Sequence, residues 1–372
     1  MSEAKIWIGL DLGLTRTSVC ITDSEGIPLR ERECDSNLVA LKEALAGFSI
    51  DRIGGMAVEA GAGTHIVRKL RSAGFPVAMF EARKASKFLS LRRNKTDASD
   101  ARGLADLARL GRHSVSQVHL KTTACQQIRS SLVVRKRFIM MRVAAEALLR
   151  SNLALHGRRL KPVYSRKGLR AQVKMEIAAV ALEEGINLEP NLGALLSVCE
   201  SLRAYVEKLD RDLADKAKSL EVCRLLMEVP GIGPVCALSF YSAIEDPTRF
   251  RVASDVGAYL GLIPRRYQSG AASRTRGITK TGSRLTRGHL VMAAAVFART
   301  APDCSLKSWY LALRERAGSK RARVALARKL AVILLAMWKD DAHFELWRTA
   351  PAAGLSERSP AERKAGVTSP IQ

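Results

Sequence analysis

The chain has 372 residues, enough for two or three domains that each bury a core. Lysine and arginine number 61 against 36 acidic residues, a formal net charge of +25, and only 5% of the residues are aromatic. This balance favours a polyanionic partner, and nucleic-acid backbone more than a base-stacking surface. No apolar run reaches the roughly 20 residues of a spanning helix, and no signal peptide is expected. The seven scattered cysteines include no C-x-x-C pair, which disfavours a zinc site.

Two predicted strands each carry one acidic residue among apolar and small residues. In the strand–turn–strand pattern of Lys5–Ile21, period-two sidedness places Asp11 on the same face as Gly9. Ile53–Ala60 repeats the arrangement with Glu59. A carboxylate on an apolar strand costs free energy unless a cation or a hydrogen-bond donor meets it. A strand-end acid beside a turn is the simpler interpretation of either residue, but the pair favours a site for a hard cation such as Mg²⁺ beside phosphate.

The first 110 residues alternate predicted strands and helices in the order β-β-β-α-β-α-β. This order fits a mixed sheet with helices on its faces. Further strands are predicted over residues 27–32 and 76–80, and helices over 38–46 and 65–72, the latter capped by Thr64.

A helix is predicted over residues 94–110. Thr96 or Asp97 can cap it, and acids in a first turn complement the helix dipole. Asp97 and Asp100 are also three residues apart and therefore share a helix face, which Leu104 continues towards the sheet. We therefore predict that both carboxylates point at the sheet that carries the other two acids.

Residues 121–175 hold 14 lysines and arginines and one acid, Glu146. A long helix is predicted over 122–155, and its basic positions would line nucleic acid. A solvated charged face is the alternative, although such faces normally mix signs. A helix over 173–184 and a heptad seam over 195–220 follow, and the partner of the seam, in this chain or another subunit, stays open. The basic residues assigned to nucleic acid up to this point are Arg92, Arg93, Lys95, Arg129, Arg135, Lys136, Arg137 and Arg142.

A second functional block is predicted in the C-terminal half. Residues 226–237 indicate a helix, a glycine hairpin and a helix, and amides around Gly231 and Gly233 can hold a phosphate, although a tight turn explains the pattern equally well. Residues 261–300 hold eight basic residues and no acid, with Ser269 in a predicted loop. Its hydroxyl can attack a phosphodiester while arginines stabilise the developing charge, although a serine that only contacts phosphate is the simpler interpretation. The basic residues assigned to nucleic acid here are Arg265, Arg266, Arg274, Arg276, Lys280, Arg284 and Arg287.

Together these motifs resemble the DEDD transposases of bacterial insertion sequences, which are related to the Piv DNA invertases. The resemblance covers residues 1–110, through GLDLG, AVEA and NKTDASDA, and about 223–310, through VPGIGPVCA, PRRYQSG and ITKTGSRLTRGHL. It implies a RuvC-like, ribonuclease-H-type α/β fold for the first domain. It also implies four carboxylates that hold Mg²⁺ or Mn²⁺ and a serine nucleophile. The matching residues are Asp11, Glu59, Asp97, Asp100 and Ser269.

The implied function is DNA strand cleavage and rejoining through a phosphoserine, by the transposase of a bacterial insertion sequence. The resemblance further implies composite active sites in a tetramer built from dimers. A structured bridge RNA from the element would pair with target and donor double-stranded DNA, so that base pairing reads the sequence. The expected location is the cytoplasm, at the nucleoid. The alternatives are a RuvC-like metal-dependent nuclease without a covalent intermediate, and an actin-like or sugar-kinase-like ATPase, whose later glycine motifs are missing here.

The expected domains follow from these blocks. A catalytic domain is followed by a basic helical and coiled-coil region, then by a mostly α-helical transposase domain with a helix-hairpin-helix-like segment, by C-terminal helices and by a disordered tail. The boundaries are 1–112, 113–222, 223–310, 311–348 and 349–372.

Overall fold

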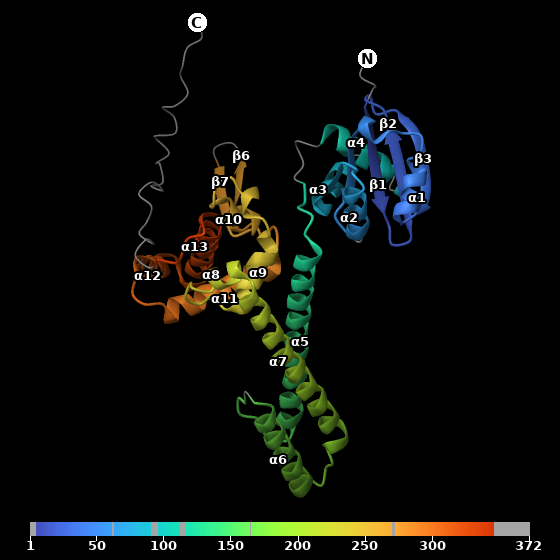
Figure 1. The fold of residues 1–372 in the computed structure, drawn as a ribbon. Helices are drawn as coiled ribbons and strands as arrows, with labels where there is room; N and C mark the ends of the chain where they lie inside the picture. The colour runs from blue at the N-terminus through green and yellow to red at the C-terminus, as the bar shows by residue number, and fades with distance from the viewer. Residues whose placement is uncertain are drawn as a thin grey trace. The chain divides into compact units, whose positions relative to one another are not determined.

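The computed structural model describes residues 5–61, 63–90, 96–111, 117–163, 165–269 and 272–345, and within these ranges the side chains of residues 166 and 266–276 lie outside the description. The chain divides into two compact units, Met1–Thr122 and Thr123–Gln372; Figure 1 draws both. The finer division at residues 112, 222, 310 and 348 stays a prediction, and the expected disordered tail lies outside the described residues. In the part of the chain that is described, no helix is long and apolar enough to cross a membrane.

The first unit is built on a five-stranded mixed sheet in the order β3-β2-β1-β4-β5. The antiparallel part comprises β1 (Ile6–Leu12), β2 (Arg16–Thr22) and β3 (Pro28–Asp35). On the other side of β1, β4 (Ile53–Glu59) and β5 (Val77–Phe80) run parallel to it. The alternating pattern therefore predicted all five strands, with boundaries that differ by no more than a few residues.

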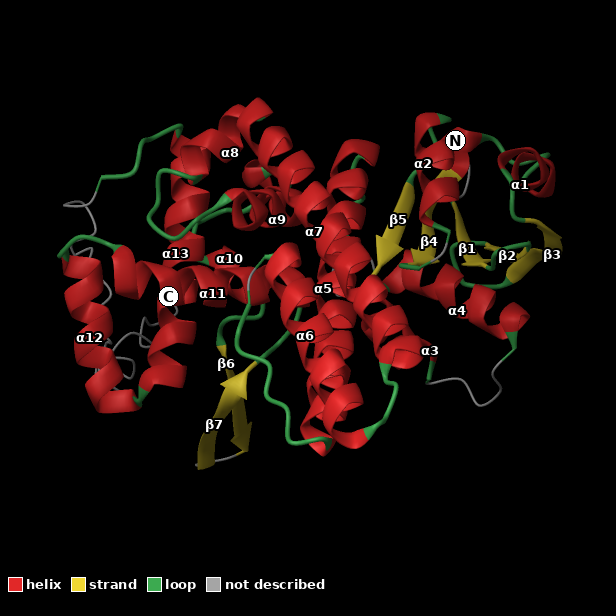
Figure 2. Cartoon of the chain, turned by 90° about the horizontal axis from the view of Figure 1, so that it is seen from below, coloured by secondary structure: helices red, strands yellow, loops and turns green. Residues whose placement is uncertain are grey.

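Helices cover both faces of this sheet. One face packs its apolar side chains on α1 (Leu38–Ala44) and α2 (Thr64–Ser72). The other packs on α3 (Ala82–Leu89) and α4 (Asp97–Leu110), and Figure 2 shows the two pairs of helices on opposite sides of the sheet. The sequence did not predict α3, and a 3-10 turn precedes β4 at residues 50–52. The predicted cap of α2 was wrong, because the helix already begins at Thr64 and its hydroxyl donates to the Gly61 carbonyl (2.8 Å).

Three helices form the first part of the second unit. They are α5 (Thr123–Leu155), α6 (Arg166–Glu184) and α7 (Ala194–Ser219), and a short π-helical turn at residues 189–193 leads into α7. The seam partner that the sequence left open is α5 of the same chain, since α7 packs along it.

Charged residues fix the register of this α5–α7 seam. Arg203 donates to Glu146 over 2.8 Å, and both side chains are buried, with 5% and 7% exposed. Arg135 of α5 donates to Asp210 of α7, about two turns further along α7. Because residue numbers rise on one helix as they fall on the other, the helices are antiparallel. The predicted apolar seam is thus interrupted by ion pairs.

The apolar part of the predicted seam is confirmed, because four of its positions are buried and the other three are partly buried. The buried positions are Cys199, Leu202, Val206 and Leu213. The polar break that the heptad pattern places at Lys216 disappears, because the buried residue in that turn is Ala217. The seam therefore continues to the end of α7.

A helical bundle completes the second unit. Its core includes the fully buried side chains of Phe240, Phe297 and Leu330. A two-stranded ribbon, which the sequence did not predict, projects from it (Figure 2) and consists of β6 (Pro264–Ser269) and β7 (Ala272–Ile278). The bundle helices are α8 (Glu221–Leu226), α9 (Pro234–Ile244), α10 (Asp255–Tyr259), α11 (Arg284–Thr300), α12 (Ser305–Ala317) and α13 (Ser319–Asp340), with a 3-10 turn at 247–249.

Candidate functional site

The register of the sheet brings the first two predicted acids together. Leu10 of β1 pairs with Val58 of the parallel strand β4. Continued by one residue, this register places Asp11 beside Glu59. Paired residues of parallel strands lie on the same face of a sheet, and both acids are partly buried there. Two carboxylates therefore lie at the carboxyl ends of neighbouring strands.

Helix α4 lies directly on the same face of the sheet. A Cβ atom on Gly9 would come within 1.9 Å of the Ala101 carbonyl oxygen and 2.3 Å of the Ala105 amide nitrogen. Near the beginning of β4, a Cβ atom on Gly55 would meet the Ala108 carbonyl oxygen at 3.9 Å. The helix therefore runs antiparallel to β1 and β4, and its first turn lies at the sheet end that holds the two acids. Glycine is required at position 9 for this close approach.

The first turn of α4 adds the other two acids without using them as caps. The Thr96 side chain caps the helix by accepting a hydrogen bond from the Ser99 amide (3.2 Å). Asp97 is exposed and Asp100 is partly buried. Leu104, one turn further on, is buried against the sheet as predicted. The first turn of α4, with Asp97 and Asp100, thus lies at the end of the sheet that carries Asp11 and Glu59. Because Asp97 is exposed, the expectation that both carboxylates point at the sheet stays a prediction.

These four residues match a divalent cation in donor type and in backbone placement. Carboxylate oxygens are the protein ligands that Mg²⁺ prefers, usually in small number with water and substrate phosphate. In the conformation described, however, no three acidic, histidine or cysteine side chains of the described residues lie close enough to share a metal ion. The structure therefore brings together the strand ends and the helix start, but not the four side chains around one point.

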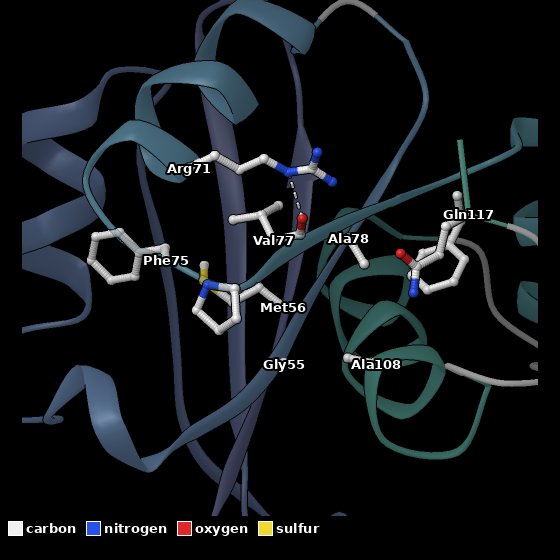
Figure 3. Close-up of a pocket in the computed structure, with 10 residues that line it drawn as sticks. Gly55, Met56, Arg71, Phe75, Val77, Ala78, Ala108 and Gln117 are labelled. Atoms are coloured by element: carbon white, nitrogen blue, oxygen red, sulfur yellow. Dashed lines mark hydrogen bonds between the residues drawn. The ribbon is translucent and has the colours of Figure 1, made fainter. Parts of the chain in front are cut away.

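A separate cavity of about 280 Å³ lies in the same unit (Figure 3). It is lined by Met56 of β4, by Phe75 and by residues of β5, and Arg71 spans one side. The Arg71 Nε atom donates to the Val77 carbonyl oxygen over 2.8 Å, and burial lowers the pKa of this guanidinium. None of the four acids lines this cavity, so it is not part of the acid site.

The predicted basic face of α5 is only partly available to a ligand. Arg135 is paired with Asp210, and Arg142 lies 3.8 Å from Glu146. Both arginines therefore neutralise acids within the α5–α7 pair. Three other predicted contacts on this helix form no ion pair with any residue described: Arg129, Lys136 and Arg137. The predicted contacts Arg92, Arg93 and Lys95 lie outside the described residues.

The two hairpin glycines between α8 and α9 have different roles. Gly231 has φ +86°, and a Cβ atom there would lie 2.7 Å from the Ala293 carbonyl oxygen and 2.8 Å from the Phe297 amide nitrogen. Packing against α11 therefore explains this glycine. A Cβ atom on Gly233 would meet nothing within 4 Å, at the start of α9. Of the two predicted phosphate contacts, only Gly233 has open space around it.

Ser269 lies at the tip of the β6–β7 ribbon, whereas the sequence predicted a loop. It ends β6 and pairs with Ala272, across a turn that lies outside the described residues. Arg265 is directly opposite Arg276 in the ribbon register. Like charges at opposed positions destabilise a strand pair, so the ribbon has arginine positions where a bound anion would relieve repulsion. Among the basic residues around the ribbon whose side chains are described, Arg265, Lys280 and Arg284 are exposed.

Arg287, predicted to contact nucleic acid, is instead buried at the base of the ribbon. Only 8% of it is exposed. Its Nη1 atom donates to the carbonyl oxygens of Leu260 (2.9 Å) and Thr281. Burial, and then the neighbouring Arg284, lower the pKa of this guanidinium. No pattern in the sequence distinguished this arginine from the exposed ones nearby.

Comparison with known proteins assigns a family to each of the two regions. Residues 8–157 match the DEDD family described as "Transposase" and named for IS110, and residues 223–308 match "Transposase IS116/IS110/IS902 family". The chain is 28% identical to "Transposase for insertion sequence element IS1111A" of Coxiella burnetii, over 91% of this chain and 90% of that protein. It is also 28% identical to "Transposase for insertion sequence element IS1328" of Yersinia enterocolitica, over 88% and 94%. The first region contains all four acids and the second contains Ser269.

Proposed function

Since the chain belongs to the IS110/IS116 family of DEDD transposases, it is an enzyme that cleaves and recombines DNA, and we propose which of its residues carry the reaction. The first set is the four carboxylates at the carboxyl end of β1 and β4, which would hold Mg²⁺ or Mn²⁺. The second is Ser269 on the ribbon, which would attack the DNA. The family match implies a RuvC-like fold for the first unit.

The observation that supports the carboxylate site is the direction of α4 on the sheet. The β1–β4 register puts Asp11 and Glu59 side by side, and the Gly9 contact holds the first turn of α4, with Asp97 and Asp100, at the same end. A divalent cation bound there would neutralise phosphate charge and lower the pKa of a coordinated hydroxyl. The protein's own contribution would be to hold four carboxylates beside a polyanion. The carboxylates repel one another, and a bound cation would remove this repulsion.

The serine proposal rests on the chemistry of the ribbon. The Ser269 hydroxyl would lose its proton as its Oγ atom forms a bond to the phosphorus of a DNA strand. The bond from phosphorus to the leaving deoxyribose oxygen would break, and that oxygen would take up a proton. The phosphoserine conserves the phosphodiester energy, so rejoining needs no ATP. Guanidinium groups of the ribbon would stabilise the charge that develops on the phosphate. In the ribbon register the arginine position nearest Ser269 on the opposite strand is Arg274, which pairs with Tyr267.

We also propose that a structured RNA and further copies of the chain take part. The +25 charge with 5% aromatic residues suits contact with nucleic-acid backbone. A protein of this kind would leave sequence recognition to base pairing by a guide RNA. Purified protein should then bind duplex DNA with little sequence preference, and element-encoded RNA should confer a preference that follows changes in its pairing loops.

A metal-dependent nuclease without a covalent intermediate remains the second candidate. It is favoured by one observation: all four acids lie in one unit, so the carboxylate site does not need Ser269. Metal-bound water or a DNA 3′-hydroxyl would then be the nucleophile. Both family matches are to transposases, which argues against the actin-like or sugar-kinase-like ATPase.

The test is a recombination reaction with element-end DNA, target DNA, Mg²⁺ and the flanking RNA, stopped with detergent. The proposal predicts a DNA–protein adduct that maps to the peptide containing Ser269. Ser269→Ala should abolish both adduct and products, whereas Ser273→Ala on the same ribbon serves as its control. Asp11→Asn should abolish cleavage with folding intact, with Asp51→Asn as control.

Two results would decide against parts of this scheme. Cleaved ends with no adduct in the wild-type reaction would leave the nuclease candidate. Full recombination by Asp11→Asn would remove the carboxylate site. If separate subunits supply the acids and the serine, mixing Asp11→Asn with Ser269→Ala should restore part of the activity.

A further inference from the structure

We propose that Arg287 is a positioning residue that holds the base of the β6–β7 ribbon, and thereby sets the position of Ser269 for strand cleavage. This inference rests on the function proposed for Ser269. It also replaces the prediction that Arg287 contacts nucleic acid. The grounds are its hydrogen bonds, its burial, the crowding of the ribbon base and the anchoring of the helix that carries it.

A single nitrogen of Arg287 joins the two chain segments that enter and leave the ribbon. Leu260 lies four residues before β6 begins, and Thr281 lies three residues after β7 ends. The Nη1 atom donates one hydrogen bond to each of their carbonyl oxygens. Both hydrogens of this nitrogen are therefore used, and only 8% of the residue is exposed. A phosphate contact at this atom would require breaking one of these bonds.

The two backbone segments at the ribbon base lie close together around this arginine. The Thr279 amide donates to the Ile263 carbonyl (2.9 Å), and the Lys280 amide donates to the Gly261 carbonyl (3.1 Å). A Cβ atom on Gly261 would come within 2.4 Å of the Thr281 amide nitrogen. The two segments thus cross at backbone contact, and Arg287 bonds to both where they cross.

Three residues of this crossing have a left-handed backbone. They are Gly261 (φ +67°), Lys280 (φ +58°) and Gly282 (φ +68°). A non-glycine residue in this region costs free energy and persists only where its surroundings hold it. The Lys280 amide bond and the Arg287 bond to Thr281 lie on either side of that strained position and would hold it.

Helix α11, which carries Arg287, is itself fixed to the bundle core. The neighbouring residue Thr286 is buried, and its hydroxyl donates to the Ser239 carbonyl of α9 (3.1 Å). Ser283 caps the start of the helix by accepting from the Thr286 amide (3.2 Å). Two adjacent residues of α11 therefore connect the ribbon base to the core: Thr286 bonds to α9, and Arg287 bonds to the ribbon base.

Among the described residues, the partners of the Arg287 guanidinium are backbone carbonyl oxygens, those of Leu260 and Thr281. No carboxylate of that part of the chain forms an ion pair with it, in contrast with Arg203, which pairs with Glu146. Removing the guanidinium would leave the carbonyl oxygens of Leu260, a fully buried residue, and of Thr281 without this donor, and buried backbone groups rarely lack a hydrogen-bond partner. The base would then open, and the ribbon would lose its fixed direction.

The experiment compares Arg287→Met, Arg287→Lys and the control Arg299→Met, an exposed arginine at the far end of the same helix. Methionine keeps the apolar stem without donors, and lysine keeps one nitrogen that can bond two carbonyls. Hydrogen exchange of the peptide covering residues 260–281 reports on the ribbon base. Adduct formation and DNA affinity are measured on the same samples, after circular dichroism and melting show that each variant is folded.

We expect Arg287→Met to speed exchange of the Thr279 and Lys280 amides by at least about tenfold. Adduct formation should slow about 100-fold, the loss expected for a misplacement of about 1 Å, while DNA affinity stays within about threefold. Arg287→Lys should recover part of both effects, and Arg299→Met should match wild type. A residue needed only for folding would not separate rate from affinity in this way.

Unchanged exchange in Arg287→Met would overturn the proposal, whatever happens to activity. A loss of affinity as large as the loss of rate would also overturn it, because it would make Arg287 a nucleic-acid contact. Failure of the serine mechanism is separate, because Ser269→Ala would then react normally. The exchange result for Arg287→Met would still show whether Arg287 holds the ribbon base.

Discussion

Replacing Gly9 with alanine should impair DNA cleavage although no carboxylate is altered. The added Cβ atom would lie 1.9 Å from the Ala101 carbonyl oxygen and 2.3 Å from the Ala105 amide nitrogen. Both are backbone atoms of α4, so no side-chain rotation relieves the overlap. Ordinary contacts of a Cβ atom begin at 3.4 Å, so α4 has to move from β1 by about 1.5 Å, the difference between the two distances.

This movement has an effect on stability and a larger one on the proposed chemistry. Overpacking of a core typically costs about 1–3 kcal/mol. Asp97 and Asp100 move with α4, whereas Asp11 and Glu59 stay on the sheet. A misplacement of about 1 Å at a reacting centre lowers a rate about 100-fold, so we expect a loss of that size.

The assay is single-turnover cleavage of element-end DNA in Mg²⁺, with urea unfolding of the same protein. Gly61→Ala is the matched control, because a Cβ atom there would meet nothing within 4 Å. Wild-type cleavage by Gly9→Ala would refute the reasoning, since α4 would then not position the acids. An equal loss in Gly61→Ala would refute it as well.

Three further predictions test other parts of the structure. Glu146→Gln should lower the free energy of unfolding by about 3–5 kcal/mol in urea titrations because it leaves Arg203 buried without its partner, whereas replacing both by leucine and methionine should cost much less. Burial first, and nearby cations next, lower the pKa of His289 from 6.5 to about 4. The unfolded chain therefore binds this proton first as pH falls, and up to about 3 kcal/mol of stability should be lost between about pH 6.5 and 4, a loss absent in His289→Gln. Lys136→Ala with Arg137→Ala should reduce the slope of log affinity against log salt by about 1.8 if both contact duplex phosphates.

Strand β1 could be predicted because its two faces carry different residues. Ile6, Ile8 and Leu10 pack in one core, whereas Trp7, Gly9 and Asp11 lie on the opposite face, and such alternation with a period of two is the sequence signature of a strand. The placement of Asp11 beside Glu59 could not be read in the same way, since strand register depends on pairing between distant segments. The acids were identified by their unusual surroundings and their resemblance to a family, and the register then placed two of them together.

The ribbon escaped prediction for the opposite reason. Pro264–Ser269 and Ala272–Ile278 show no alternation of apolar and polar residues. Without this alternation, the sequence carries no periodic signal that marks either segment as a strand. Sequence reasoning correctly singled out the stretch for its arginines and its serine, but it had no signal that distinguishes a ribbon from a loop.

The α5–α7 pair shows a third kind of limit. A heptad reading treats charged residues as outside the seam, yet Arg203 and Asp210 lie within it. Their partners are on α5, more than fifty residues away in sequence, so no local pattern indicates that these charges are neutralised. A buried ion pair such as Arg203–Glu146 adds little net stability, and fixing the register of the two helices is the role that suits it better.

The same limit changes how the net charge of the chain should be interpreted. The basic residues of α5 and of residues 261–300 were predicted to contact nucleic acid, but Arg135 pairs with Asp210 in the α5–α7 seam and Arg287 bonds to carbonyl groups at the ribbon base. Each internal guanidinium raises the net charge without contacting a phosphate, and each paired one has lost part of its attraction for DNA. The salt dependence of DNA binding should therefore follow the unpaired positions, such as Lys136 and Arg137, and fall short of the value that the +25 charge alone suggests.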